Sequence, residues 1–171
     1  MGPDQQLGVG GRAMTDHSPQ QDPHHRSSDA SFGVIPIRYR DRHWQVLLVQ
    51  HRQGHWAFPK GHPDPHESHA TTACRELFEE TQCRVLRFLQ IPAFTETYQF
   101  RAAHRMISKT VTYFLAEVDG DPRPQPEELK AACWFPLREA DQKATFDKCR
   151  KMLQQVHEWL GDRTPDQLPG R

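Results

Sequence analysis

Three glutamates stand within five residues in the string RELFEE: Glu76, Glu79 and Glu80. At about 100° per residue along a helix, Glu76 and Glu80 lie one turn apart and Glu79 lies beside them. Like charges at this spacing destabilise a helix by roughly 0.2–0.5 kcal/mol per pair, so the cluster is either solvated surface or a cation site. Hard oxygen ligands at this density suit Mg²⁺ or Mn²⁺, which share their remaining positions with water and substrate phosphates.

The sequence around these glutamates predicts the helix that must position them. No Gly or Pro occurs from His66 to Thr81, and Ala70, Cys74, Leu77 and Phe78 recur at helical spacing. We expect an amphipathic helix of roughly four turns, with these apolar side chains on one side and the glutamates on the other.

Arg75 precedes the second glutamate of the cluster, Glu79, by four residues. On a helix this pair can hold one carboxylate in place while the others bind metal. The alternative is an ordinary surface ion pair, which contributes less than about 1 kcal/mol.

The stretch from Gly61 to Cys83 resembles the signature of the Nudix hydrolases, pyrophosphohydrolases that act on nucleoside diphosphates linked to another moiety. That pattern runs Gly, five residues, Glu, seven residues, Arg-Glu, an aliphatic residue, any residue, Glu-Glu, any residue, Gly, and an aliphatic residue. The residues that fit it are Gly61, Glu67, Arg75, Glu76, Leu77, Glu79 and Glu80, with Cys83 as a small apolar ending.

One position, Gln82, departs from this pattern because the family has the helix-ending Gly there. That position commonly needs a left-handed backbone, which costs a residue other than Gly about 1 kcal/mol. The departure concerns helix termination and stability and leaves the metal ligands intact.

The resemblance implies a cofactor of Mg²⁺ or Mn²⁺ bound by Glu76, by Glu80 and by a carbonyl of the preceding loop, at Gly61. Glu79 would be a further ligand or a group that orients the others. In the family the general base is either a helix glutamate or one from a distant loop. Glu128 occupies such a loop, where it could equally be a solvated neighbour of Glu127.

Over residues 32 to 160 the chain is similar to the asymmetric diadenosine tetraphosphate hydrolases of the animal and bacterial type, through HWAFPKGH, SKTVTYFLAEV and FDKCRKMLQQVHEWL. In those enzymes a loop His and Lys, and a Lys ahead of the long strand, contact the polyphosphate. These roles carry over to His55, Lys60 and Lys109, and His62 lies beside them. Tyr98 matches an aromatic position that stacks on adenine, although a strand Tyr can also serve packing alone.

The resemblance therefore implies a Mg²⁺-dependent enzyme in which water attacks diadenosine tetraphosphate near one end and releases ATP and AMP. Two alternatives stay open within the family: the capped or triphosphorylated 5′ end of RNA, and a diphosphoinositol. From a different class, the chain could be a catalytically inactive nucleotide-binding regulator. Retention of every charged signature residue favours the enzyme.

The composition of the 171 residues fits one domain with a single substantial core. Lys+Arg and Asp+Glu both number 22, so the chain lacks the basic excess of nucleic-acid or anionic-membrane binders. No apolar run is long enough for a membrane span or a signal peptide. We expect a cytoplasmic monomer whose partner is a small molecule.

Four cysteines, at 74, 83, 133 and 149, show no CxxC or zinc-type spacing and are predicted to be reduced and mostly buried. Residues 1–31 are polar and predict a disordered tail, residues 32–160 the domain, and residues 161–171 a frayed end. Strands are expected at 32–40, 44–52, 85–91, 94–100 and 107–120, a short apolar segment at 133–137, and a helix from Phe146 to Leu160. This order predicts the α/β class, as a Nudix-type α/β/α sandwich around a mixed β-sheet.

Overall fold

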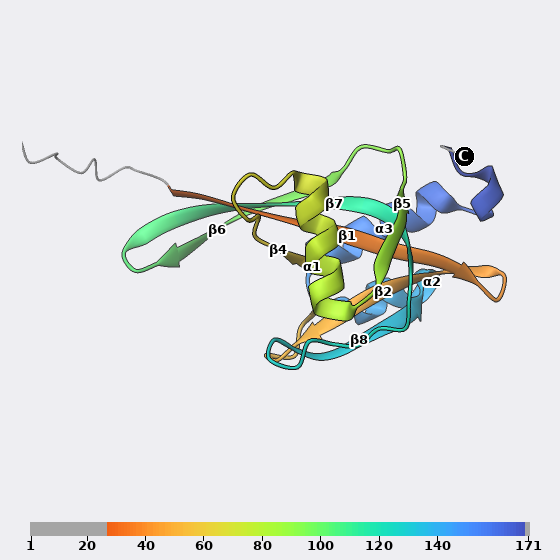
Figure 1. Cartoon of the computed structure of the whole chain (residues 1–171), viewed down its shortest axis with the longest axis horizontal. Helices are drawn as coiled ribbons and strands as arrows, with labels where there is room; N and C mark the ends of the chain where they lie inside the picture. Colours follow the sequence, from red (N-terminus) through yellow and green to blue (C-terminus); the bar gives the residue numbers. More distant parts are fainter. Residues whose placement is uncertain (1–26, 170–171) are drawn as a thin grey trace, which may run out of the picture.

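The computed structural model describes residues 27–169, which form an eight-stranded mixed sheet between helices on both of its faces. Figure 1 shows α1 crossing one face, with α2 and α3 on the other. The elements are β1 (Ser27–Arg40), β2 (His43–His51), β3 (Trp56–Ala57), β4 (Lys60–Gly61), α1 (His69–Thr81), β5 (Arg84–Phe88), β6 (Phe94–Ala102), β7 (Arg105–Asp119), β8 (Leu129–Pro136), α2 (Leu137–Lys143), α3 (Asp147–Leu160) and a 3₁₀ turn (Pro165–Gln167). The predicted α/β/α sandwich is confirmed.

Both faces of the sheet carry a buried apolar layer. Successive strand residues point to opposite faces, so Val34 packs under α1 whereas Ile35 packs against α3. Leu77 of α1 and Leu153 of α3 are among the fully buried side chains of the two layers. The sheet is therefore held between two helical layers, as an α/β sandwich requires.

The hairpin of β1 and β2 turns through Asp41 and Arg42, whose φ angles are 53° and 65°. Two consecutive positive φ values match the twist of a two-residue hairpin turn. The expected pairing of these strands is confirmed, with Arg40 opposite His43.

The two strands of this hairpin then separate. They pair with each other only as far as Ile37 and Val46, after which β1 pairs with β4 and β2 pairs with β3. The segment from Trp56 to Gly61 therefore runs across the opening between two diverging strands. At the crossing, the Val34 N–H donates to the Pro59 carbonyl at 3.3 Å, which fixes the segment to β1.

The predicted helix begins three residues later than expected, at His69 instead of His66. Ser68 caps it, because its side chain accepts a hydrogen bond from the Thr71 N–H. His66 has φ 65°, a left-handed conformation that ends any helix reaching it.

The predicted domain boundaries were too narrow at both ends. Residues 27–31 were assigned to the tail, but they belong to β1 and pair in parallel with β7; residues 1–26 lie outside the described residues. At the other end, Leu168 is 4% exposed and the Trp44 indole donates to the Arg163 carbonyl at 2.8 Å. The prediction of a frayed C-terminal end is therefore wrong for residues 161–169, and residues 170–171 are not described.

Helix α2 was not expected, and it buries Leu137 and Ala140 beside α3. The four cysteines are free, as predicted, although only Cys83 and Cys149 are buried and the other two are partly exposed. Among residues 27–169, no helix combines the length and apolar character needed to cross a bilayer.

Candidate active site

Arg75 connects the first turns of α1 to the loop that precedes the helix. Its Nε donates to Glu67 at 2.7 Å and its Nη2 donates to the His62 carbonyl at 2.8 Å. Its Nη1 donates to Glu76 at 3.0 Å and to Glu79 at 3.1 Å. The predicted pair of Arg75 and Glu79 is present, but it is one contact in a network that fixes the loop onto the helix.

Glu67 is the most fully bonded carboxylate of this network. Besides Arg75, the Thr72 hydroxyl donates to it at 2.8 Å and the Asp64 N–H at 2.9 Å. The hydrogen bond from Arg75 is the largest cause that holds its pKa at about 2, below the ordinary range. The reciprocal bond raises the pKa of Arg75 above its ordinary value. Glu67 therefore serves to hold the loop.

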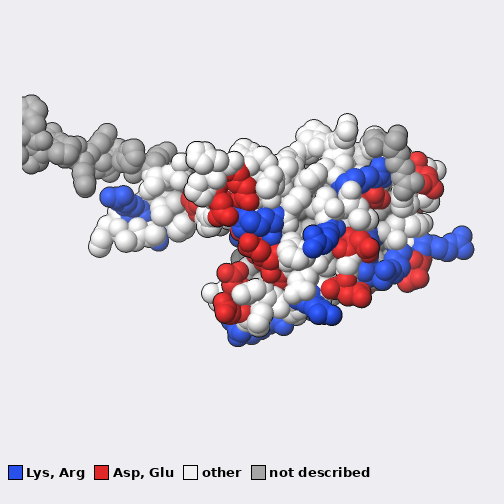
Figure 2. Space-filling view, in the orientation of Figure 1, with Lys and Arg blue, Asp and Glu red and all other residues white. Residues whose placement is uncertain are grey.

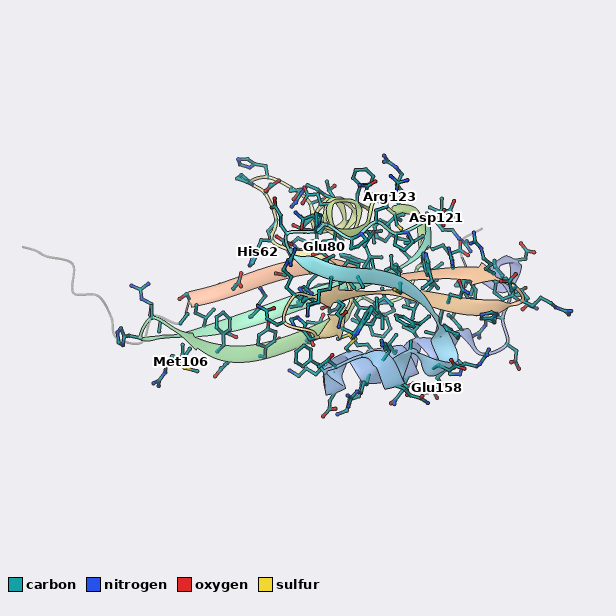
Figure 3. The ribbon with its side chains drawn as sticks, turned by 90° about the horizontal axis from the view of Figure 1, so that it is seen from below. His62, Glu80, Met106, Asp121, Arg123 and Glu158 are labelled. Carbon is teal, nitrogen blue, oxygen red and sulfur yellow. The ribbon has the colours of Figure 1, made fainter. Side chains whose placement is uncertain are left out.

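Glu80 lies on the side of α1 that faces the sheet, as Figure 3 shows. It is 4% exposed, and its Oε2 has no hydrogen-bond partner among the described residues. Burial raises its pKa to about 8, and the charges of Glu76 and Glu128 act in the same direction. A buried oxygen without a partner is costly in a folded protein unless a ligand uses it.

This burial corrects the helical wheel drawn from the sequence. Glu80 faces inward with Ala73 and Leu77, whereas Phe78, placed on the apolar side, is 40% exposed and packs under the Arg84 guanidinium. The wheel gives the angles between side chains but not which side meets the sheet.

Gly61 and Glu76 are in direct contact. A Cβ atom at Gly61 would lie 2.0 Å from Cδ of Glu76, so any larger residue at 61 would displace this carboxylate. Burial raises the pKa of Glu76, although hydrogen bonding to Arg75 opposes the shift. The structure therefore brings together the predicted ligands Gly61, Glu76 and Glu80.

Glu128 comes from the loop that closes the end of α1. Backbone N–H groups of Arg123 and Gln125 donate to the carbonyls of Thr81 and Glu80, at 2.8 and 3.0 Å. The loop is thereby fixed, and the charge of Glu128 acts on both Glu76 and Glu80. The structure places this exposed glutamate at the site, together with the helix.

The donors gathered here are hard oxygens of the kind that Mg²⁺ binds. Figure 2 shows acidic side chains gathered beside α1 with basic side chains among them. Within residues 27–169, no three His, Cys, Asp or Glu side chains are arranged as a ready ligand cage. That agrees with the habit of Mg²⁺, which takes one or two carboxylates and completes its shell with water and phosphate. Glu76, Glu80 and the backbone of Gly61 could hold such an ion.

On the opposite face of the sheet lies a cavity of about 460 Å³ with aromatic walls. Tyr98 and Tyr113 come from strands of the sheet, and Phe146 stands at the start of α3. The rings of Tyr98 and Phe146 are 39% and 53% exposed, so both present free ring surface. The terminal helix was predicted to begin at Phe146, but Phe146 occupies the N-cap position before α3 and lines the cavity.

His55 and Lys60, which the resemblance predicts to contact the polyphosphate, line the same cavity. The His55 ring stacks on His51 at 4.2 Å between centroids. Burial lowers the pKa of His51 to about 4 and also lowers that of His55, and the charge of Lys60 adds to both shifts. The positive charge of this wall therefore comes from Lys60, whose own pKa is lowered by burial and by Lys109.

Lys109 and His62 meet at a carboxylate that the sequence did not predict. Asp29 Oδ2 lies 3.0 Å from Lys109 Nζ, and Asp29 Oδ1 lies 2.9 Å from His62 Nε2. Burial opposes ionisation of Asp29, but the hydrogen bonds from Lys109 and His62 outweigh it and lower its pKa. Lys109 and His62, both predicted to bind substrate, are therefore paired with residue 29, which composition had assigned to the tail.

The profile of the NUDIX domain matches residues 28–156 of the chain. The chain belongs to the Nudix family of pyrophosphohydrolases. It is 38% identical over 120 residues to the bis(5'-nucleosyl)-tetraphosphatase [asymmetrical] of Rattus norvegicus, covering 68% of this chain and 80% of the relative.

Two solved structures show the same Nudix fold. The Ap4A hydrolase of C. elegans, in a binary complex, has a TM-score of 0.60 at 22% identity, covering 79% of this chain and 99% of that one. The NUDIX domain of Shewanella oneidensis NrtR, complexed with ADP ribose, has a TM-score of 0.63 at 22% identity, covering 82% and 94%.

The departure from the Nudix signature at Gln82 has a visible structural consequence. Its φ of 61° is left-handed, and its N–H donates to the Phe78 carbonyl. The backbone therefore adopts the helix-ending conformation that the signature Gly would adopt, although this conformation is less favourable for Gln than for Gly.

Proposed function

We propose that this Nudix domain is a divalent-cation-dependent hydrolase that splits diadenosine tetraphosphate asymmetrically into ATP and AMP. The observation that carries the proposal is the segment from Trp56 to Gly61. It contributes Ala57 and Lys60 to the aromatic cavity and Gly61 to the carboxylate site. This short segment thus connects a cavity that could hold a base to carboxylates that could hold a metal ion, and the Lys60 side chain lies between the two.

The cation would be Mg²⁺ or Mn²⁺, which supplies charge neutralisation at the attacked phosphorus and an activated water. Glu80 and Glu76 would hold it, together with the Gly61 carbonyl, and Arg75 keeps Glu76 in place through its 3.0 Å bond. Glu128 or Glu79 accepts the proton of the attacking water. Glu79 already shares Arg75, whereas Glu128 lies in the loop over the end of α1.

The substrate follows from what the other residues can bind. Tyr98 and Phe146 offer ring surface for one base, and such stacking contributes about 1–3 kcal/mol per base in comparable sites. Lys60 lines the cavity and is close enough to Glu76, Glu80 and Lys109 for their charges to act on it, so it could bind the phosphates between base and metal. A nucleoside with a long phosphate chain fits this order, and the rat relative, a bis(5'-nucleosyl)-tetraphosphatase, agrees with it.

The test is product analysis of a panel in ¹⁸O-labelled water: diadenosine tetraphosphate, ADP-ribose, ATP, a triphosphorylated RNA and a diphosphoinositol, each with Mg²⁺. We expect ATP and AMP from the first, with the label in one product only, and slow turnover of the rest. Two molecules of ADP, or a preference for ADP-ribose or RNA, would reject the substrate. Nucleotide binding without phosphate release from any compound would indicate an inactive regulator.

We also propose that the protein works as a cytoplasmic monomer with no nucleic-acid partner, in agreement with its zero formal net charge. Light scattering on the purified full chain would test the oligomeric state, and a dimer at micromolar concentration would reject it.

A further inference from the structure

A carboxylate stands inside the aromatic cavity, on Glu96 of β6. Glu96 lies two residues before Tyr98, so both side chains point to the same face of the strand. Its register partner is Val111 of β7, whose side chain is buried in the layer under α3. Glu96 therefore lies deeper along the same wall as the Tyr98 ring.

Two other charged side chains at the cavity, Lys148 and Asp147, already have partners. Lys148 Nζ donates to the Thr97 carbonyl at 2.6 Å, and Asp147 pairs with Arg150 at 3.1 Å. For the Glu96 carboxylate, no hydrogen bond or ion pair is found within residues 27–169. Its oxygens are thus open to a ligand, beside the rings of Tyr98 and Tyr113, while its charge also acts on Lys60 of the same cavity.

Glu96 acts on the interior of the cavity and not only on solvent. Burial, and then the charge of Glu96, raise the pKa of Tyr113 well above its ordinary value and that of Cys149 to about 12. Both residues line the cavity, from β7 and from α3. The carboxylate therefore faces the space between the sheet and the helix.

We propose that Glu96 accepts a hydrogen bond from the 6-amino group of a bound adenine, and so makes the cavity select a 6-amino purine over a 6-oxo purine. A carboxylate can only accept, and the 6-amino group of adenine is a donor. A 6-oxo group in its place would set two acceptors against each other and leave the carboxylate unpaired. The inference rests on the proposed function in placing a base in this cavity.

Binding of AMP and IMP to the full chain without metal, measured by calorimetry, tests the inference because the two ligands differ only around the 6-position. The wild type should bind AMP about 10- to 100-fold more tightly, the range for a hydrogen bond to a charged group. Glu96→Ala should reduce this preference to within about 3-fold. Glu96→Gln should raise the affinity for IMP, because its amide can turn and donate to the 6-oxo group.

The matched control is Asp147→Asn, which removes a negative charge from the rim of the same cavity. Asp147 is 82% exposed and paired with Arg150, so the preference for AMP should stay at the wild-type value. Melting temperatures show whether each variant is folded, and Glu96→Gln keeps the side-chain volume if Glu96→Ala does not fold.

Equal binding of AMP and IMP by the wild type, or a preference that survives both substitutions, would overturn the inference. An equal loss for both nucleotides would also overturn it, because it would show an effect on the shape or field of the cavity only. The proposed function is tested separately, since no hydrolysis is needed here. Discrimination between AMP and IMP without cleavage of diadenosine tetraphosphate would keep this inference and reject that function. Equal cleavage of the adenine and hypoxanthine tetraphosphates would keep the proposed function and reject this inference.

Discussion

The two ends of α1 hold carboxylates in opposite conditions. At its start, Glu67 accepts hydrogen bonds from Arg75, Thr72 and the backbone of Asp64, and its pKa is held at about 2. Near its end, Glu80 is buried, one oxygen has no partner, and its pKa is raised to about 8. The first arrangement is complete without a ligand, whereas the second is not. The Nudix signature thus contains both a carboxylate that holds the loop, Glu67, and one whose oxygen is left open for a ligand, Glu80.

Glu80→Gln should produce the largest effect, because an amide cannot replace a charged metal ligand in a buried site. We expect kcat at saturating Mg²⁺ to fall by more than about 100-fold, beyond what loss of a group that merely supports a ligand costs. The melting temperature without metal should not fall. Glu139→Gln is the comparison, because Glu139 is 56% exposed in α2, outside the site, and its loss should leave kcat unchanged. Near-normal turnover of Glu80→Gln would remove the distinction between the two ends.

Arg75→Met tests the hydrogen-bonded network around Glu67, before the start of α1. It leaves Glu67 without its main donor, so the free energy of unfolding should fall by about 1–3 kcal/mol in urea titrations. Arg138→Met is the matched control, since Arg138 is 59% exposed and lies 3.6 Å from Glu139. That change should cost less than about 0.5 kcal/mol. If both variants lost the same stability, the network around Arg75 would be ordinary surface.

The pH dependence of stability without metal should have two parts of opposite sign. Glu80 has a raised pKa, so its contribution is fully present below about pH 4.5 and is lost as the pH rises through about 8. Glu67 has a lowered pKa, so its contribution is present above about pH 4.5 and is lost as the pH falls towards 2. Melting curves in EDTA from pH 3 to 9 should show both changes.

Each substitution should remove one part of this profile. Glu80→Gln should flatten the range from pH 4.5 to 8, and Glu67→Gln should flatten the acidic range, while Glu139→Gln in α2 should leave the profile unchanged. A wild-type profile that rises steadily from pH 4.5 to 8 would contradict the assignment of Glu80.

Gln82→Gly should give the smallest effect, at the last residue of this end of the helix. Relief of the left-handed conformation should raise the free energy of unfolding by a few tenths to about 1 kcal/mol. Lys151→Gly, on the exposed face of α3, has ordinary helical surroundings and should cost about 1 kcal/mol. A lower melting temperature for Gln82→Gly would show that the side chain contributes more than its backbone costs.

The sequence predicted the features that depend on local order. The hairpin at Asp41, the grouping of Glu76 and Glu80 one turn apart on a helix, and the left-handed position of Gln82 all follow from spacing and turn chemistry. The side of α1 that meets the sheet did not follow, because helical angles are relative and Glu80 shares the inner side with Leu77.

The pairing of strands far apart in the sequence could not be predicted either. Asp29 joins Lys109 because β1 and β7 run in parallel, and backbone hydrogen bonds hold those first five residues whatever their polarity. Composition alone therefore assigned residues 27–31 to a tail. The place of Phe146 was predicted wrongly for a related reason, because whether an aromatic residue faces a core or a cavity depends on the surface opposite it. Helix α2 was not predicted at all.

The separation of β1 from β2 has a consequence for chemistry at the phosphate chain. The six residues from Trp56 to Gly61 are fixed at one end to β2 through β3 and at the other end to β1 through β4. Their extended length sets the distance between the base cavity and the carboxylates. If the proposed function holds, that distance would set how many phosphates separate the bound nucleoside from the phosphorus that water attacks. An insertion in this segment should therefore change the pair of products, while leaving both the base preference and the metal requirement unaltered.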